Sequence, residues 1–167
     1  MDVAAKSYYE EKLVCFELAG EVFGVPISMV QEIIRMQEIT EIPRAPEFVE
    51  GVINLRGKII PVIDLRKRFG LGMGEQTKNT RIVVIKVGEI TVGMVVDAVS
   101  EVIKLNDEDI EPPSPIVASL DAEYIKGVGK IESKLIILLD TEKILSHQEK
   151  AGLQLATSDA PAGLIEG

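Results

Sequence analysis

The sequence has few of the residues that build disulfides, metal centres and covalent catalytic sites. Its 167 residues contain one cysteine, Cys15, one histidine, His147, and no tryptophan. A single cysteine cannot form an internal disulfide, and these two residues cannot supply a zinc site of the His/Cys type. Cys15 lies in an apolar stretch without a neighbouring cation, which indicates a buried thiol rather than a nucleophile. We therefore expect no catalytic residue, no metal and no cofactor.

Long hydrophobic runs and clusters of positive charge are also missing. No apolar stretch approaches the roughly 20 residues that span a bilayer. The chain carries 18 basic and 27 acidic residues, a formal net charge of −9. Because binding to a phosphate backbone needs clustered lysine and arginine, nucleic acid is not an expected partner. Together with the unpaired cysteine and no apparent leader segment, these features predict a cytoplasmic protein that does not insert into a membrane.

The abundant residues favour β-structure. Hydrophobic residues make up 46% of the chain and charged residues 27%, a composition typical of a folded domain. Valine (18) and isoleucine (21) together account for 39 residues, against seven aromatic ones. Side chains branched at Cβ pack well on the pleated surface of a sheet. We therefore expect an all-β or β-dominated fold.

The chain also contains a degenerate internal repeat. Residues 16–43 resemble residues 85–113, and residues 50–64 resemble residues 126–140. The expected organisation is an N-terminal tail (1–11), a first unit (12–69), a linker (70–79), a second unit (80–145) and a C-terminal helix with a flexible tail (146–167). The first unit holds 8 basic and 8 acidic residues and is neutral, whereas the second holds 7 and 12 and carries −5. The two units should therefore present different surfaces to partners.

Short apolar runs separated by turn residues predict five strands in each unit. The expected strands are 12–18, 22–26, 39–42, 51–55 and 59–64, then 81–87, 90–96, 99–105, 124–131 and 135–140. The exception is 28–35, where Ile27, Val30, Ile33 and Ile34 recur at helical spacing around a possible N-cap at Ser28. This spacing predicts a short helix. Two more are expected, at 65–69 and from 141 to about 151.

The segment 48–65, with the sequence FVEGVINLRGKIIPVIDL, resembles almost letter for letter the signature of the CheW-like domain of bacterial chemotaxis. The resemblance includes Val30–Ile33, Val92–Asp97 and the strand at 135–140, and it extends over residues 12–150 as one domain. It implies a pseudo-repeated pair of five-stranded, SH3-like β-barrels with short helices. This implication agrees with the repeat found above.

The CheW-like domain occurs as a regulatory domain of the histidine kinase CheA, fused to a receiver domain, and as a freestanding adaptor. A chain of this length with short tails resembles the freestanding form. The resemblance implies a non-enzymatic adaptor that couples transmembrane chemoreceptors, the methyl-accepting chemotaxis proteins, to CheA in membrane-associated arrays. Its implied partners are the regulatory domain of CheA and the cytoplasmic tips of the receptors. Two alternatives stay open: an enzyme, and a receptor-binding decoy or scaffold that lacks kinase coupling.

The resemblance also implies two docking surfaces. The receptor is expected to bind in a groove between the units, and the kinase is expected to contact the second unit. The groove residues are Val14, Ile27, Val30, Glu32, Ile33, Arg56 and Val99, and the kinase-binding residues are Arg81, Val83, Glu111 and Ile116. Arg56 is expected to form a bidentate pair with Glu32 or with a carboxylate of the partner. The alternative is that the apolar groove residues only seal the two units together.

The strand at 81–87 carries apolar residues at every position from Ile82 to Ile85. Both of its faces therefore need to be covered. One face should fill its own unit, and the other is covered either by the neighbouring unit or by a protein partner.

Overall fold

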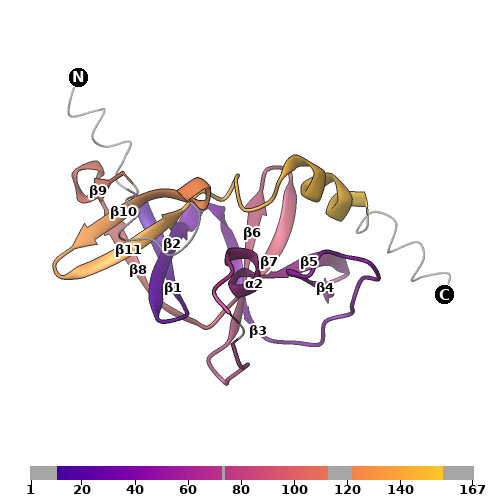
Figure 1. Cartoon of the computed structure of the whole chain (residues 1–167). Coiled ribbons are helices and arrows are strands. Elements are labelled where there is room, and N and C mark those ends of the chain that lie inside the picture. Colours follow the sequence, from indigo (N-terminus) through magenta and orange to yellow (C-terminus); the bar gives the residue numbers. More distant parts are fainter. Residues whose placement is uncertain (1–10, 73, 113–121, 156–167) are drawn as a thin grey trace.

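The computed structural model describes residues 11–72, 74–112 and 122–155, which form two β-sheets with short helices (Figure 1). The strands are β1 (Glu11–Leu18), β2 (Glu21–Pro26), β3 (Val30–Arg35), β4 (Val49–Leu55), β5 (Lys58–Asp64), β6 (Arg81–Val87), β7 (Ile90–Val96), β8 (Ala98–Leu105), β9 (Ile110–Glu111), β10 (Ile125–Ile131) and β11 (Lys134–Leu139). The helices are α2 (Leu65–Phe69) and the 3-10 helices η1 (Ile27–Met29), η2 (Asp107–Asp109) and η3 (Ala122–Tyr124). The predicted β-dominated fold class is confirmed.

Each of the two sheets contains strands from both sequence repeats. Sheet A has the order β8-β1-β2-β11-β10-β9, and sheet B has the order β3-β6-β7-β5-β4. The hairpin β1–β2 thus joins strands of the second unit, and the hairpin β6–β7 joins strands of the first. Sheet B has the expected five strands and sheet A has six; closure of either sheet into a barrel stays a prediction.

The expectation that residues 12–69 and 80–145 each form their own subdomain is therefore wrong. Only Asp97 separates β7 from β8. One residue is too short for a hairpin turn, so the chain runs straight on from sheet B into sheet A. The β2–β3 connection makes the reverse crossing. The repeat is real, but its two copies exchange hairpins.

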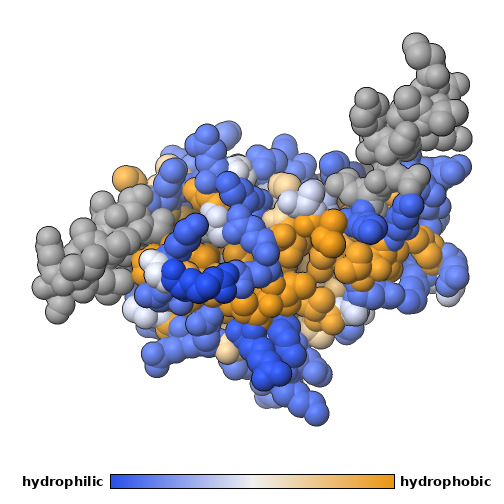
Figure 2. Space-filling model, turned by 180° about the vertical axis from the view of Figure 1, so that it is seen from behind, coloured by the Kyte–Doolittle hydropathy of each residue, from blue (hydrophilic) through white to orange (hydrophobic). Residues whose placement is uncertain are grey.

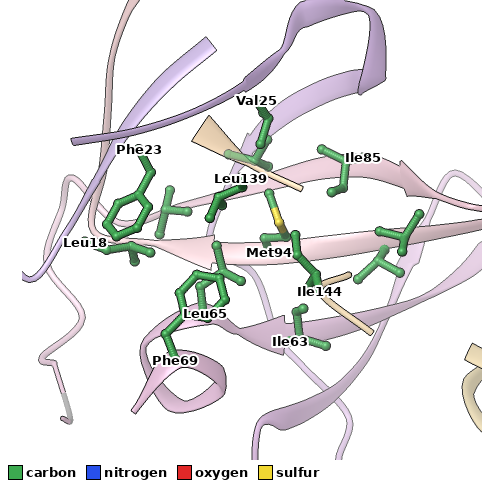
Figure 3. Packing of buried hydrophobic residues seen from close by; sticks show 14 of the residues in the cluster. Leu18, Phe23, Val25, Ile63, Leu65, Phe69, Ile85, Met94, Leu139 and Ile144 are labelled. Atoms are coloured by element: carbon green, nitrogen blue, oxygen red, sulfur yellow. The ribbon is translucent and has the colours of Figure 1, made fainter. Parts of the chain in front are cut away.

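Each sheet has a small core on one face, and the opposite faces pack together on a larger central core. The small core of sheet A includes Leu13 and Cys15, and that of sheet B includes Ile53 and Ile82. The central core takes residues from both sheets and from α2 (Figure 3); Leu18, Phe23, Val25, Ile63, Leu65, Phe69, Ile85, Met94, Leu139 and Ile144 are among them. The two sheets are therefore joined by apolar packing rather than by a flexible link.

Strand β6 is covered on both faces by this chain. Ile82 and Val84 point into the small core of sheet B, and Val83 and Ile85 point into the central core. All four side chains are fully buried. The second face of this strand is therefore covered by neighbouring parts of the same chain and not by a protein partner.

The predicted helix at 28–35 is wrong, because these residues form η1 and strand β3. Val30 lies opposite Ile85 and Ile33 lies opposite Val83, whereas Gln31 is skipped at a β-bulge. Directly opposed residues of an antiparallel pair project from the same face. The bulge therefore places Val30 and Ile33, three positions apart, on one face of the strand. The apolar spacing resembles that of a helix for this reason.

The predicted strand at 39–42 is reduced to one isolated bridge, between Thr40 and Val52. The other predicted strands agree with the structure within one or two residues at most ends. Helix α2 is found as predicted, with Asp64 accepting hydrogen bonds from the backbone N–H groups of Arg66 and Lys67. The terminal helix begins later than expected: residues 141–145 form turns, and residues 147–155 are helical.

Candidate functional site: an apolar groove between the sheets

Three exposed apolar side chains lie at or after the two crossings of the chain between the sheets. Ile27 (43% exposed), in the crossing from β2 to β3, Ile33 (41%) on β3 and Val102 (54%) on β8 are large hydrophobic residues in contact with solvent. Val30 and Val99 are partly buried on the central core beside them. Figure 2 shows apolar residues forming a band across the face of the molecule seen from behind. Contiguous exposed apolar surface of this kind marks an interaction site.

The register of the edge strands explains why these side chains are exposed. Ile33 lies opposite Val83, and Val102 lies opposite Val14, both of which belong to the central core. Ile33 and Val102 thus project from the core-facing side of β3 and β8, beyond the reach of the core itself. In β8 a register shift skips Ser100, as the bulge in β3 skips Gln31. The two repeats therefore expose Ile33 and Val102 in the same way.

The structure places Ile27 in η1, Val30, Glu32 and Ile33 on β3, Arg56 in the β4–β5 turn and Val99 on β8; that they line one groove stays a prediction. One predicted residue needs correction, and one further residue is added. Val14 is only 2% exposed and belongs to the central core, so it supports the groove from below and cannot contact a partner directly. Val102 was missed. Aligning Glu32–Ile33 with Glu101–Val102 across the repeat could have found it, because the two pairs occupy equivalent positions in β3 and β8.

The predicted ion pair between Glu32 and Arg56 is present. Glu32 lies opposite Val84 of the small core of sheet B, so it projects from the face of β3 opposite to that of Ile33. Arg56 and Gly57 form the β4–β5 turn with positive φ angles of 52° and 87°, as type I′ hairpins require. The Gly57 N–H donates to Oδ1 of Asn54 at 2.8 Å, which fixes the turn. Arg56 Nη2 is the single nitrogen that bonds Oε2 of Glu32, so the pair is not bidentate as expected. Its other donors remain available to a partner carboxylate.

A second ion pair occupies the related position in the other sheet. Lys134 Nζ, in the β10–β11 hairpin, lies 3.0 Å from Oε2 of Glu101, the repeat equivalent of Glu32. The hydrogen bond that Lys134 donates to the Glu101 carboxylate raises the pKa of Lys134. Glu101 lies opposite Cys15 of the small core of sheet A, so this pair also projects from the strand face opposite to that of the exposed apolar residue, here Val102.

The pair Arg66–Asp97 holds the β7–β8 crossing from which Val99 enters the groove. Asp97 Oδ2 lies 2.6 Å from Arg66 Nη2, and Oδ1 lies 2.9 Å from Nε. Oδ2 also accepts the backbone N–H of Ala19, at 2.9 Å. The Arg66 hydrogen bonds lower the pKa of Asp97, against the opposing effect of burial. The carboxylate thereby ties together α2, the β1–β2 turn and the crossing.

We expect the stabilisation from Asp97 to depend on pH. A carboxylate whose pKa is lowered by folding stabilises the protein above its ordinary value of 3.8 and loses this effect as the pH falls. Asp97→Asn should therefore lower the free energy of unfolding more at about pH 7 than at about pH 3. Urea unfolding of both proteins at the two pH values measures the difference. If the wild type and Asp97→Asn differed in free energy of unfolding by the same amount at both pH values, or by more at the lower one, the role given to Asp97 would be contradicted.

The predicted kinase-binding residues do not form one surface. Val83 is fully buried in the central core, so its assignment as a contact residue is wrong. Arg81 is half-buried at the start of β6 in sheet B, whereas Glu111 is exposed on the edge strand β9 of sheet A. Glu111 pairs with Lys130 at 2.6 Å. Ile116 lies outside the described residues. The strand exchange separates residues that the sequence places in one unit.

The other side chains that could carry chemistry are few within the described ranges. No group of three or more metal-ligating side chains occurs there. Cys15 is buried, and burial raises the pKa of its thiol to about 11, which keeps it protonated and unreactive at neutral pH. No helix in this part of the chain is long and apolar enough to cross a membrane.

Comparison with known proteins matches these features to a family. The family model of the CheW-like domain matches residues 12–149. The chemotaxis protein CheW of Klebsiella aerogenes is 40% identical over 141 residues, covering 84% of this chain and 85% of that protein. Its counterpart from Treponema pallidum is 36% identical over 142 residues, covering 83% and 84%. The crystal structure of the scaffolding protein TtCheW from Thermoanaerobacter tengcongensis superposes with a TM-score of 0.77 at 43% identity, covering 84% of this chain and 90% of that one. The chain therefore belongs to the CheW-like domain family of chemotaxis scaffold proteins.

Proposed function

We propose that this protein is a cytoplasmic, non-enzymatic adaptor that couples chemoreceptors to the histidine kinase CheA. The observation that carries the proposal is the exposed apolar surface of Ile27, Ile33 and Val102 at the crossings between the sheets. Family membership supports a scaffolding role in chemotaxis. In this role the protein is recruited to membrane-associated receptor arrays by its partners and does not enter the membrane.

The receptor binds in the groove with the helical hairpin at its cytoplasmic tip. A helix docks by laying an apolar face against an apolar groove, with polar contacts at the rim. Ile27, Ile33 and Val102 supply exposed apolar area, and Val30 and Val99 lie deeper on the core. The Glu32–Arg56 pair orients the partner more than it stabilises the fold, because an ion pair this exposed contributes only about 0–1 kcal/mol.

Ile33→Asp and Arg56→Ala should each weaken receptor binding by about tenfold or more. Ile33→Asp places a charge in the proposed apolar contact, and Arg56→Ala removes the cation proposed to bind a partner carboxylate. Binding of a soluble receptor tip fragment, followed by calorimetry, measures the effect. Leu135→Asp is the matched control, since Leu135 is 46% exposed but lies on β11 outside the groove. Kinase binding in solution should persist in all three variants. Loss of both partners together, or unfolding, would make the groove structural instead.

The kinase is proposed to bind separately from the receptor, at the open edge of sheet A. Strand β9 ends this sheet, and Glu111 on it is exposed. Proline-bearing residues follow it in the sequence, and prolines reduce the ordering cost of docking. This surface shares no residue with the groove, so both partners can bind at once.

The adaptor should change the activity of CheA while having none of its own. Purified protein alone should show neither ATP hydrolysis nor autophosphorylation, and adding it to CheA with receptor should raise kinase activity. A phosphorylation assay with each component omitted in turn checks this. Turnover by the chain alone would favour an enzyme, and receptor binding without retention of CheA in a pull-down would favour the decoy.

A further inference from the structure

A hollow of about 500 Å³ lies where β3 ends and β6 begins, beside the segment that joins α2 to β6. Three of its lining residues are cations, Arg35, Lys78 and Arg81, and the others are uncharged. No acidic residue lines it. A chain with a net charge of −9 thus has a local excess of positive charge here. We call this feature the Arg35–Arg81 hollow.

The register of the sheet forces two of these cations together. Arg35 on β3 lies directly opposite Arg81 on β6. Side chains of directly opposed residues share a face of the sheet, and like charges in this position are destabilising. Within the described ranges, neither arginine nor Lys78 forms an ion pair with a carboxylate, whereas Arg56, Arg66 and Arg68 each do. The fold therefore maintains a repulsion that a bound anion would relieve.

The hollow is also held in shape by local hydrogen bonds. Arg81 Nη1 donates to the carbonyl oxygens of Lys78 and Thr80 at 2.8 and 2.9 Å. No bond within the described part of the chain uses its Nε or Nη2. The Thr77 N–H donates to Oγ1 of Thr80 at 2.8 Å, and the Asn79 N–H donates to Oγ1 of Thr77 at 3.0 Å. Lys78 is thus presented by a fixed turn, next to a guanidinium with free donors.

We propose that the Arg35–Arg81 hollow binds an acidic peptide segment of a partner protein, one with two or more neighbouring carboxylates. Guanidinium groups match the planar, two-oxygen geometry of carboxylates. A long polyanion such as nucleic acid would be repelled by the rest of this acidic chain, whereas a short segment reaches only the cations. The proposal rests on these residues and does not depend on the receptor or on CheA.

The test is an NMR titration of the ¹⁵N-labelled protein with a capped peptide of four glutamates. Amide shifts should concentrate at residues 35–36 and 76–81, and binding should weaken as salt rises toward about 0.3 M, where exposed charges are screened. Arg35→Gln and Lys78→Gln should each reduce affinity by roughly three- to fivefold, the effect of losing one exposed ion pair. Lys143→Gln, which removes an equally exposed charge elsewhere, should leave affinity unchanged.

Folding does not confound this test. Arg35→Gln removes a like-charge contact, so its melting temperature should equal or exceed that of the wild type. A capped peptide of four glutamines should cause no shifts. Shifts spread over the whole surface, equal affinity in all variants, or saturation of the same amides by inorganic phosphate alone at similar concentration would each overturn an acidic-peptide site.

Discussion

Val83→Asp is expected to unfold the protein or to destabilise it by more than about 4 kcal/mol. Val83 is fully buried in the central core, where it lies between the two sheets. An aspartate there would lose its hydration without gaining a cation or a hydrogen-bond donor, and it would also remove the apolar contacts of the valine. Loss of the folded signal in far-UV circular dichroism, or a large shift of the urea midpoint, measures this effect.

Val102→Asp is the matched control for this substitution. Val102 projects from the corresponding side of its strand, opposite a residue of the same core, but it is 54% exposed. The same chemical change should therefore cost about 1 kcal/mol or less, as surface substitutions do. If Val83→Asp folded as stably as Val102→Asp and only weakened kinase binding, Val83 would be a surface contact and its place in the core would be wrong.

Gly51→Ala should lower the free energy of unfolding by about 3 kcal/mol or more. Gly51 has a φ of +144°, a conformation that is strained for any residue with a Cβ. An added Cβ would clash with the carbonyl oxygen of Thr40. That oxygen accepts a hydrogen bond from the Val52 N–H at 2.8 Å. The clash would therefore break the bridge between Thr40 and Val52 of β4.

Gly57→Ala separates the clash from the backbone strain. Gly57 also has a positive φ, 87°, but no atom lies within 4 Å of the position of an added Cβ. In this variant the free energy of unfolding should fall only by the cost of holding an alanine in the turn conformation, roughly 1 kcal/mol. Chemical denaturation of both variants gives the comparison. If both variants lost the same free energy of unfolding, the clash with Thr40 would contribute nothing, and the Thr40–Val52 bridge would not constrain β4.

Several parts of the fold follow from the sequence because they depend on local pattern. The excess of valine and isoleucine predicts sheets, and the alternation of apolar runs with turn residues predicts most strands within one or two residues. Helix α2 follows from its capping aspartate, Asp64. The pairing of Arg56 with a carboxylate was also predictable, because a long cation in a tight turn has no core to enter. The motif at 48–65 indicates the family by itself.

The helix expected at 28–35 shows where local pattern misleads. A bulge at Gln31 gives a strand the three-residue apolar spacing of a helix, and nothing in the segment itself distinguishes the two. The β6 pairing decides the matter, since Val30 and Ile33 can share a face only if one residue is left out of the register.

The sequence by itself determined most of the strands and the repeat, whereas only the tertiary structure decided which repeat each hairpin joins and that Arg56 pairs with Glu32. Two copies of one pattern offer the same apolar faces and the same hydrogen-bonding edges, so pairing within a copy and pairing between copies look identical along the chain. The one-residue connection at Asp97 settles the choice by forcing the chain from sheet B into sheet A. That crossing buries Val83, separates Arg81 from Glu111, and places Ile33 and Val102 at the edges where the sheets meet.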